Sequence, residues 1–382
     1  MTILAAALSL TLALGAQEIP AYFLENNYLQ ERLRQVPKGK HFLFITDYHQ
    51  ERSSHTSTAV MSYVKKQMGI DRVVFGGDCF DWAPDKAAAA QKLGRYFDEL
   101  YAAFGEGLIW VQGNHDCNSS AVSKYKIPED VALIPDVQCY DLTIGHFKSE
   151  RTYDEDMLAR YRDKADLSDD ERAGALAWIK MHYWVDDPAL KIRFIVIETD
   201  DRGVTARHII RGRELVLEQM PFLEKALETA PKGYTPIVFS HQLGNNKQGL
   251  LKTSAHTPVI NTVAKFRAKT GRRAFLVSGH CHVDEAMLIH SGENIWDVQE
   301  CVAGGKIGKD GVLLVWCNRD AYKAGSTRYA AGGPGVLLKQ SLNPRAKLGT
   351  PTEVSFDIVT LTRKGVVFTR IGAGEPQRIF TW

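Results

Sequence analysis

Short apolar runs recur along this chain, and most of them end in a loop rich in Gly, Asp, Asn or His. Because these runs are continuously apolar, they predict strands that are buried on both faces of a sheet. The predicted strands cover residues 42–45, 73–75, 108–111, 193–197, 237–239 and 274–277.

Segments with apolar residues at helical spacing lie between several of these strands. Residues 56–68 predict a helix that stops at Gly69, and residues 87–104 predict another. Residues 214–229 have a similar pattern, although Pro221 favours a kink or a new start within it. This alternation predicts an α/β fold with a largely parallel sheet, in which ligands bind at the carboxyl ends of the strands.

Residues 148–187 interrupt the alternation. Ser168 and Glu171 have the spacing of a capping box, which predicts the start of a helix with Leu176, Ile179 and Tyr183 on one stripe. The segment is also dense in Tyr and Trp. We interpret it as a helical insertion near the functional site, where it could act as a lid. The alternative is that its aromatic side chains only pack the insertion onto the domain.

The last part of the chain is rich in predicted strands. They cover residues 312–316, 356–361 and 366–371, and a Gly/Pro-rich loop at 330–335 lies between them. We expect these strands to complete a second sheet that packs on the first. The expected organisation is a helical segment at 17–38, a main domain at 39–293 that carries the insertion, and a β-rich part at 294–382.

The bulk composition narrows the functional classes. The chain has 382 residues, of which 45% are hydrophobic, so a sizeable core is expected. A formal net charge of +2 gives no electrostatic argument for nucleic acid or for a membrane surface. The six cysteines include no C-x-x-C pair, which argues against a structural zinc ribbon. A disulfide between Cys79 and Cys117 is conceivable, because both follow predicted strands at one sheet edge.

The N-terminus has the pattern of a secretory leader. Residues 3–14 are apolar, and small residues followed by Gln17 and Glu18 come directly after them. The run is too short to span a bilayer, and no other stretch is long and apolar enough. We expect residues 1–16 to direct export to the periplasm or the medium. The alternative is an ordinary N-terminal helix on a cytoplasmic protein.

Five short motifs carry the candidate chemistry, and each follows a predicted strand. They are Asp47-Tyr48-His49, Gly77-Asp78-Cys79-Phe80-Asp81, Gly113-Asn114-His115-Asp116, Ser240-His241 and Gly279-His280-Cys281-His282. The carboxyl ends of parallel strands meet at one edge, so these polar side chains should lie close together. They offer enough nitrogen and oxygen ligands for two adjacent divalent metals.

A two-metal hydrolase needs cations about 3.5–4 Å apart, which requires a carboxylate that bridges both. Asp47 and His49 are two residues apart on an extended segment, so they project to one side and can share a metal. Asp78 is the natural bridging carboxylate, and Asn114 offers a neutral carbonyl oxygen. Mixed His and carboxylate ligands of this kind suit Mn, Fe or Zn. The remaining predicted ligands are His241, His280 and His282.

Together these motifs resemble the calcineurin-like metallophosphoesterase superfamily. Its pattern is Asp-x-His, Gly-Asp-x-x-Asp, Gly-Asn-His followed by Asp or Glu, a lone His, and Gly-His-x-His, and every element is present here. The resemblance implies a four-layer αββα sandwich of two packed mixed β-sheets flanked by helices. Asp rather than Glu after Gly-Asn-His is common in the bacterial phosphodiesterase-like members.

The resemblance also implies roles for the residues. His115 would not be a ligand but would donate a proton to the leaving-group oxygen, and Asp81 or Asp116 would orient it. A hydroxide that bridges the metals would attack phosphorus in line. One metal would be held by Asp47, His49, Asp78 and His282, and the other by Asp78, Asn114, His241 and His280.

The sequence therefore predicts a binuclear metal-dependent hydrolase of small phosphoesters, with phosphodiesters preferred. The alternatives are a phosphomonoesterase of the same superfamily and a mononuclear zinc hydrolase. A nuclease lacks support, because no basic stripe with interleaved aromatic residues is present. A non-catalytic scaffold is disfavoured, since such proteins usually lose ligands and none is missing here.

Overall fold

The computed structural model describes residues 19–199, 213–243, 257–282, 284–290, 298–300, 304–309, 311–317, 320 and 346–382. Two features expected from the sequence lie outside these residues, namely the leader at 1–16 and the Gly/Pro-rich loop at 330–335.

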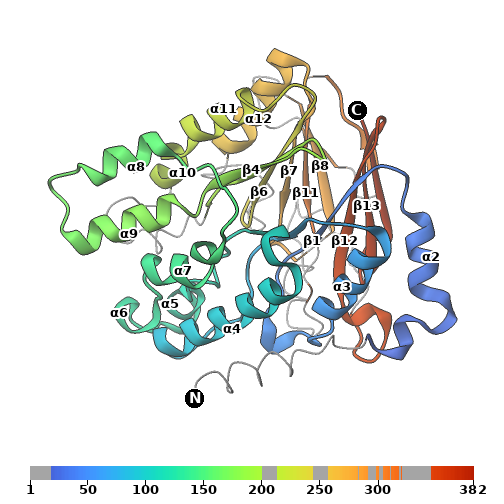
Figure 1. Ribbon diagram of the computed structural model, residues 1–382, viewed down its shortest axis with the longest axis horizontal. Coiled ribbons are helices and arrows are strands. Elements are labelled where there is room, and N and C mark those ends of the chain that lie inside the picture. Colours follow the sequence, from blue (N-terminus) through green and yellow to red (C-terminus); the bar gives the residue numbers. More distant parts are fainter. Residues whose placement is uncertain are drawn as a thin grey trace, which may run out of the picture.

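Two mixed seven-stranded sheets form the centre of the protein (Figure 1). The first sheet has the order β10 (Gly304–Lys306), β14 (Gln377–Thr381), β13 (Gly365–Gly372), β12 (Ser355–Leu361), β1 (Lys40–Ile45), β2 (Val73–Phe75) and β3 (Leu108–Trp110). The second has the order β4 (Tyr183–Asp187), β5 (Ile192–Val196), β6 (Thr235–Ser240), β7 (Phe275–Ser278), β11 (Gly311–Trp316), β8 (Glu285–His290) and β9 (Val298–Glu300).

Parallel strands form the middle of each sheet. In the first sheet β1, β2 and β3 are parallel neighbours, and in the second β5, β6 and β7 are. The five strands that precede the polar motifs all belong to these two parallel groups. The α/β architecture of two mixed sheets flanked by helices is thus confirmed.

Helices cover the outer faces of the sheets. The longer ones are α2 (Tyr28–Gln35), α3 (Ser57–Met68), α4 (Lys86–Phe104), α8 (Glu155–Arg162), α9 (Asp169–Ile179), α11 (Met220–Glu228) and α12 (Thr257–Thr270). Shorter ones are α5 (Ser119–Tyr125), α6 (Glu129–Ala132), α7 (Asp136–Leu142) and α10 (Arg213–Glu218). Figure 1 shows the α8–α9 hairpin extending from the body of the protein at the left of the view.

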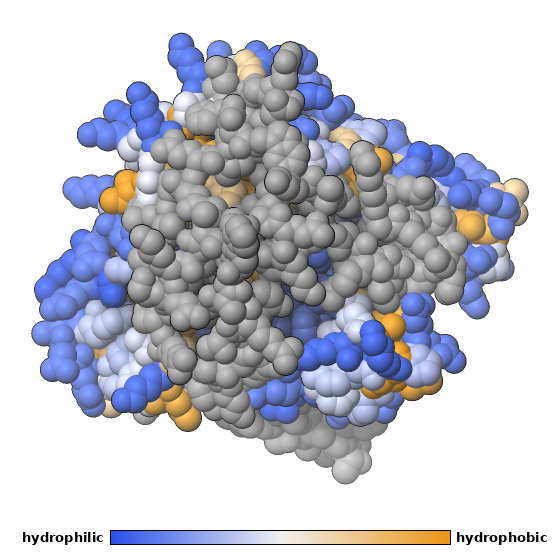
Figure 2. Space-filling model, turned by 180° about the vertical axis from the view of Figure 1, so that it is seen from behind, coloured by the Kyte–Doolittle hydropathy of each residue, from blue (hydrophilic) through white to orange (hydrophobic). Residues whose placement is uncertain are grey.

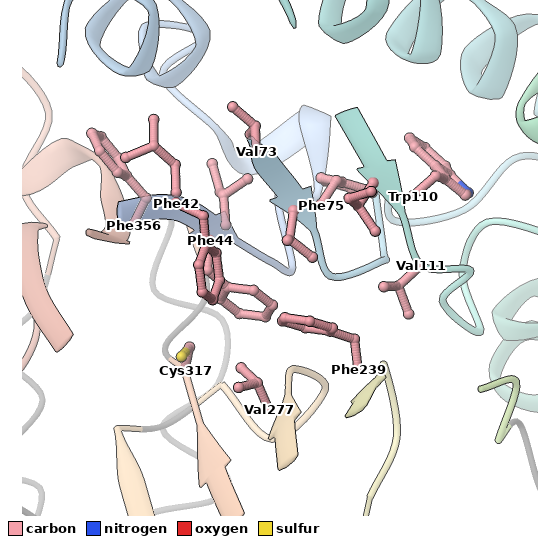
Figure 3. Close-up of a cluster of buried hydrophobic side chains, with 14 of the residues drawn as sticks. Phe42, Phe44, Val73, Phe75, Trp110, Val111, Phe239, Val277, Cys317 and Phe356 are labelled. Carbon is pink, nitrogen blue, oxygen red and sulfur yellow. The ribbon is translucent and has the colours of Figure 1, made fainter. Parts of the chain in front are cut away.

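The main core lies between the two sheets. Figure 3 shows Phe44 of the first sheet and Phe239 of the second facing one another, and their ring centroids are 6.0 Å apart. Phe42 of β1 meets Phe194 of β5 edge to face at 5.3 Å. The alternate residues of β5, including Ile195, point instead to the helical layer of α11 and α12. Alternate residues of the strand therefore pack either between the two sheets or beneath the helices. Because both faces are buried, the apolar run in the sequence is continuous.

The C-terminal strands differ from the expectation that they complete a second sheet. β12 pairs antiparallel with β1 and extends the first sheet through β13 and β14, whereas β11 lies between β7 and β8 in the second. The last part of the chain thus contributes to both sheets. Single-sequence patterns show that a segment is a strand but not which edge it joins, because partner choice depends on long-range pairing.

The insertion is partly helical and partly extended. The capping box of α9 forms as predicted, since Ser168 and Glu171 cap one another reciprocally. Tyr183 does not continue this helix but begins β4, an edge strand of the second sheet, so its place on the helical stripe was wrong. The aromatic side chains of the insertion pack inward, as Trp184 shows by stacking on Phe222 of α11 at 4.9 Å.

The described surface is mostly hydrophilic on the face drawn in Figure 2, with apolar residues in small separate groups. Isolated exposed apolar side chains are ordinary for a folded protein. Among the described helices, none has the length and apolar character that crossing a bilayer requires.

Candidate metal centre

The five polar motifs meet at one edge of the two sheets, and backbone hydrogen bonds join their loops. The Asp47 N–H donates to the carbonyl of Gly77 at 2.9 Å, and the His49 N–H donates to that of Asp78 at 3.0 Å. The loops of the two sheets are joined by a backbone-to-side-chain bond, in which the His280 N–H donates to Asp47 Oδ2 at 2.8 Å. The loops after β1, β2 and β7 therefore form one connected unit.

Most of the predicted ligands have a left-handed backbone. A positive φ is uncommon for any residue other than glycine and costs about 1–3 kcal/mol. The surrounding hydrogen bonds must hold these residues in place, and such strain is concentrated at functional sites. The residues and their φ angles are Asp47 (53°), His49 (43°), Asp78 (61°), His280 (64°) and His282 (57°).

Two glycines of the motifs, Gly279 and Gly113, lie so close to neighbouring atoms that there is no space for a side chain. A Cβ atom on Gly279 would lie 2.0 Å from Thr46 Oγ1 and 2.7 Å from Asp47 Oδ2. A Cβ atom on Gly113 would lie 2.4 Å from Asp78 Oδ1. All three distances are shorter than real Cβ contacts allow, so a side chain at either glycine would push a candidate ligand out of position.

One group of possible ligands consists of Asp47, His49 and His282. His282 Nε2 lies 3.0 Å from Asp47 Oδ1 and 3.1 Å from His49 Nε2. Two ring nitrogens and one carboxylate oxygen thus converge on one point. Asp47 and His49 are buried, whereas His282 is partly exposed.

A second group consists of Asp78, His241 and His280. His241 Nε2 lies 3.1 Å from Asp78 Oδ2, and its Nδ1 is 2.7 Å from the carbonyl of Gly76. That carbonyl accepts a hydrogen bond from Nδ1–H, so Nε2 is the ring nitrogen that faces the carboxylate and the candidate metal position. Asp78 also belongs to a third group with His49 and His115, so its carboxylate lies between the two sets.

The electrostatics of the second group are those of a buried acid–base pair. Burial opposes ionisation of Asp78, but the charges of His241 and His115 outweigh it and hold the pKa of Asp78 well below its usual range. Burial likewise disfavours the charged form of His241, yet Asp78 and Asp47 raise its pKa to about 10. His241 is therefore protonated beside the anionic Asp78, and a cation bound here would have to displace the proton on Nε2 before that nitrogen could serve as a ligand.

Among the candidate ligands, the buried side-chain amide of Asn114 indicates most clearly that a further group binds at the site. Its side chain is 1% exposed, and neither the oxygen nor the nitrogen of its amide has a hydrogen-bond partner among the described residues. Burying such an amide costs about 1–3 kcal/mol. Ser119 holds the residue in place by donating to its backbone carbonyl at 2.5 Å. A cation bound to the amide oxygen would satisfy this group.

His115 lies beside the candidate metal centre, and its side chain is partly exposed to solvent. Its side chain is 17% exposed, and Nε2 is 3.8 Å from Asp78 Oδ2. Its Nδ1 contacts the backbone carbonyl of Asp81. Asp81 thus orients the His115 ring through its backbone carbonyl and not, as predicted, through its carboxylate. That carboxylate lies 3.7 Å from His49 Nδ1. The arrangement leaves Nε2 available to hold or move a proton.

Asp116 connects two of the motif loops. Its carboxylate accepts the N–H groups of Asp78 at 3.1 Å, Cys79 at 2.7 Å and Gly113 at 2.7 Å. Burial and the charge of Asp78 raise its pKa to about 6, although these N–H groups oppose the shift. These contacts hold the loops after β2 and β3 together. They differ from the prediction that the Asp116 carboxylate would orient the ring of His115.

The cysteines near the centre are buried and not bonded to one another. The disulfide considered between Cys79 and Cys117 is not formed. Burial and the nearby Asp116 raise the pKa of the Cys79 thiol well above its usual range. A protonated, enclosed thiol is a poor nucleophile, so Cys79 acts as a packing residue.

Several supporting residues carried no signal in the sequence. Thr46 Oγ1 donates to Asp47 Oδ2 at 2.9 Å, and Ser120 Oγ donates to the Asp81 carbonyl at 2.8 Å. Ser and Thr are so common in loops that one sequence gives no reason to single these out.

A family model described as calcineurin-like phosphoesterase matches residues 40–284, which span all five motifs. No curated protein sequence matches the chain. A dimetal phosphatase from Danio rerio is similar in structure, with 13% identity over 90% of this chain and 99% of its own, and a TM-score of 0.47. A purple acid phosphatase from yellow lupin (Lupinus luteus) has 10% identity over 91% of this chain and 54% of its own, with a TM-score of 0.46. The phosphopantetheinyl hydrolase of Mycobacterium tuberculosis has 13% identity over 74% and 91%, with a TM-score of 0.34.

Proposed function

Because this chain belongs to the calcineurin-like phosphoesterase family and is a metal-dependent phosphoesterase, we propose that it hydrolyses phosphodiesters at a centre of two divalent metal ions. The resemblance noted in the sequence is confirmed by this membership. The observation that supports two ions best is the pair of ligand groups that Asp78 adjoins, together with the buried amide of Asn114.

The ligands divide into two sets that share Asp78. Asp47, His49 and His282 would hold one ion, and His241, His280 and Asn114 would hold the other. The donor set of imidazole, carboxylate and amide oxygen suits Mn, Fe or Zn. When bound, two such ions would supply Lewis acidity and would activate a water molecule as the nucleophile.

The residues of the chain would orient the ester and manage its protons. Nε2 of His115 lies on the open side of the centre, where it would give a proton to the leaving-group oxygen. The Asp81 carbonyl would hold the ring by accepting from Nδ1, which fixes the direction of Nε2. Proton transfer from a positioned imidazole typically accelerates such a step by about 10²–10⁴-fold.

The Gly113-Asn114-His115-Asp116 motif supports a diester over a monoester, because Asp at its last position resembles the phosphodiesterase-like members of the family. Within the described part of the chain, the ion pairs of Asp47 and Asp78 are with histidines, so both carboxylates are directed at the proposed metal ions.

The test is hydrolysis of bis(p-nitrophenyl) phosphate beside p-nitrophenyl phosphate by protein reconstituted with Mn²⁺. We expect turnover of both to disappear on chelation, and the kcat/KM of the diester to exceed that of the monoester. A higher kcat/KM for the monoester would replace the proposal with a phosphomonoesterase. Turnover that survives complete chelation would refute metal-dependent chemistry at this centre.

A further inference from the structure

A partly exposed pair of aromatic rings joins the segment after the second motif to α5. Trp82 directly follows Asp81 of the second motif, and Tyr125 is the last residue of α5. Their ring centroids are 4.3 Å apart and their planes differ by 28°, so the rings are stacked. Tyr125 is 40% exposed, and the Lys124 ammonium lies 5.2 Å from the centroid of its ring.

The backbone that carries Trp82 is held on both sides. The Asp81 carbonyl accepts Ser120 Oγ at 2.8 Å and also contacts His115 Nδ1. The Ala83 N–H donates to Asn118 Oδ1 at 2.9 Å. One segment therefore fixes both the ring of His115 and the position of Trp82.

The Trp82 carbonyl is fixed as well, because it accepts Lys92 Nζ at 2.8 Å. Consecutive Cα atoms are about 3.8 Å apart, so Trp82 cannot lie far from the backbone that orients His115. The aromatic pair is thus attached to the backbone segment that holds the ring of the proposed proton donor.

Packing alone does not account for the pair. Phe75 and Trp110 stack at 4.6 Å with the same 28° between their planes, and both are fully buried. A stacked pair that served only to join α5 to the domain would be expected to resemble them. Exposed stacked rings offer an apolar, planar surface that attracts another ring.

We infer that Trp82 and Tyr125 form a leaving-group subsite that takes the aromatic ring of a phosphoester substrate. This inference rests on the proposed function, because His115 defines the leaving-group side. The substrate class is then a phosphodiester whose departing alcohol carries an aryl group or a nucleobase. Stacking on the pair would add to the transition-state binding of such esters and not to that of alkyl esters.

The test compares benzyl methyl phosphate with cyclohexylmethyl methyl phosphate, using Mn²⁺-loaded protein. Both leaving groups are primary alcohols of similar size and basicity, and only one carries an aromatic ring. We expect Trp82→Ala to lower the ratio of their kcat/KM values by about tenfold, as stacking on a tryptophan is worth. Trp82→Phe should restore most of the ratio, because a phenyl ring also stacks. Thymidin-5′-yl methyl phosphate, as a third substrate, separates a nucleobase preference from a simple aryl preference.

A matched control is Tyr234→Ala. Tyr234 is partly exposed and precedes β6, at the opposite end of the strand from His241. It should leave the ratio unchanged. If Trp82→Ala lowers both kcat/KM values equally, the residue is structural and the subsite is refuted.

Binding measurements separate this inference from the proposed function. Benzylphosphonate should bind the Mn²⁺-loaded protein more tightly than cyclohexylmethylphosphonate, and Trp82→Ala should remove that difference in calorimetry. If benzylphosphonate binds more tightly in a Trp82-dependent way but no diester is hydrolysed, the subsite is supported and the diesterase proposal is refuted. If neither the binding nor the kinetic ratio depends on Trp82, the subsite is wrong.

Discussion

Asp78 is the residue on which the two-metal account depends most. Its carboxylate adjoins both sets of ligands, and it is 1% exposed. Asp78→Asn keeps the shape but removes the charge, so we expect loss of bound metal and a fall in turnover of about 10³-fold. Metal analysis by mass spectrometry and a turnover assay test this. Asp71→Asn, at the opposite end of β2, is the matched control, and full turnover in Asp78→Asn would show that the bridging assignment is wrong.

His115 should behave differently from the ligands. We expect His115→Ala to retain both metals but to lower kcat by about 10²–10⁴-fold, because only proton donation is lost. The loss should be smaller for p-nitrophenolate, which leaves easily without a proton, than for an alcohol. His146→Ala, which removes an exposed imidazole from the surface, is the control. Loss of metal from His115→Ala would instead make this residue a ligand.

At the residue scale, most of the candidate centre could be predicted from the sequence. The ligand types and their places after strands were enough to bring Asp47, His49 and His282 together. The partner of His115 could not be predicted, because it is a backbone carbonyl and main-chain groups leave no trace in residue types. The function of Asp116 as a link between two loops was also not predicted, because the groups that its carboxylate binds are backbone N–H groups.

The helical insertion contains a buried histidine that should make folding sensitive to pH. His182 is fully buried between Trp178 and Phe222, with ring centroids at 5.3 and 5.2 Å. Burial lowers its pKa from 6.5 to about 3. The carboxylate of Asp154 is 3.9 Å from Nε2, which is too far for a hydrogen bond to offset that burial.

The direction of this effect follows from proton linkage. Between about pH 3 and 6.5 the unfolded chain binds a proton at His182 that the folded protein lacks, so the free energy of unfolding falls on acidification. Between about pH 7.5 and 5, we expect the wild type to lose about 2 kcal/mol more than His182→Leu. Urea denaturation at several pH values measures this. Equal losses in the two proteins would mean that His182 is accessible to protons in the folded state.

At the element scale, strands and helices were predicted well where their pattern was long and local. The helix predicted at 56–68 is observed as α3 (Ser57–Met68), and the break at Pro221 was confirmed by the separate helices α10 and α11. Short edge strands such as β4 were missed, because their residues also fit a helical stripe. The sheet that each C-terminal strand joins was unpredictable, since that choice depends on pairing across distant parts of the chain.

A buried network of four charges connects the two sheets across the whole molecule. Arg370 donates to Asp284 Oδ1 at 2.5 Å and to Asp357 Oδ2 at 2.7 Å, and Arg378 donates to the Trp316 carbonyl at 2.8 Å. Asp284 lies two residues after His282, one of the proposed ligands. The network thus links strands of the first sheet to the loop of the second sheet that carries this proposed ligand.

Removing one member of the network should be costly. We expect Arg370→Leu to lower the free energy of unfolding by about 3–5 kcal/mol, because Asp284 and Asp357 each lose one of their two buried cations and keep only Arg378. Lys364→Ala, an exposed cation in the turn before β13, should change it by less than about 0.5 kcal/mol. Urea unfolding of both variants measures the difference. A loss below about 1 kcal/mol for Arg370→Leu would show that the network contributes little to stability.

The most direct test of the central claim is a metal titration of the chelated protein with Mn²⁺, in which bound metal and diester turnover are measured on the same samples. A two-metal centre predicts that turnover stays low until the second ion binds and reaches its maximum at two ions per chain. Asn114→Ala should weaken binding of one ion and leave the other. Full turnover at one ion per chain would contradict a binuclear mechanism.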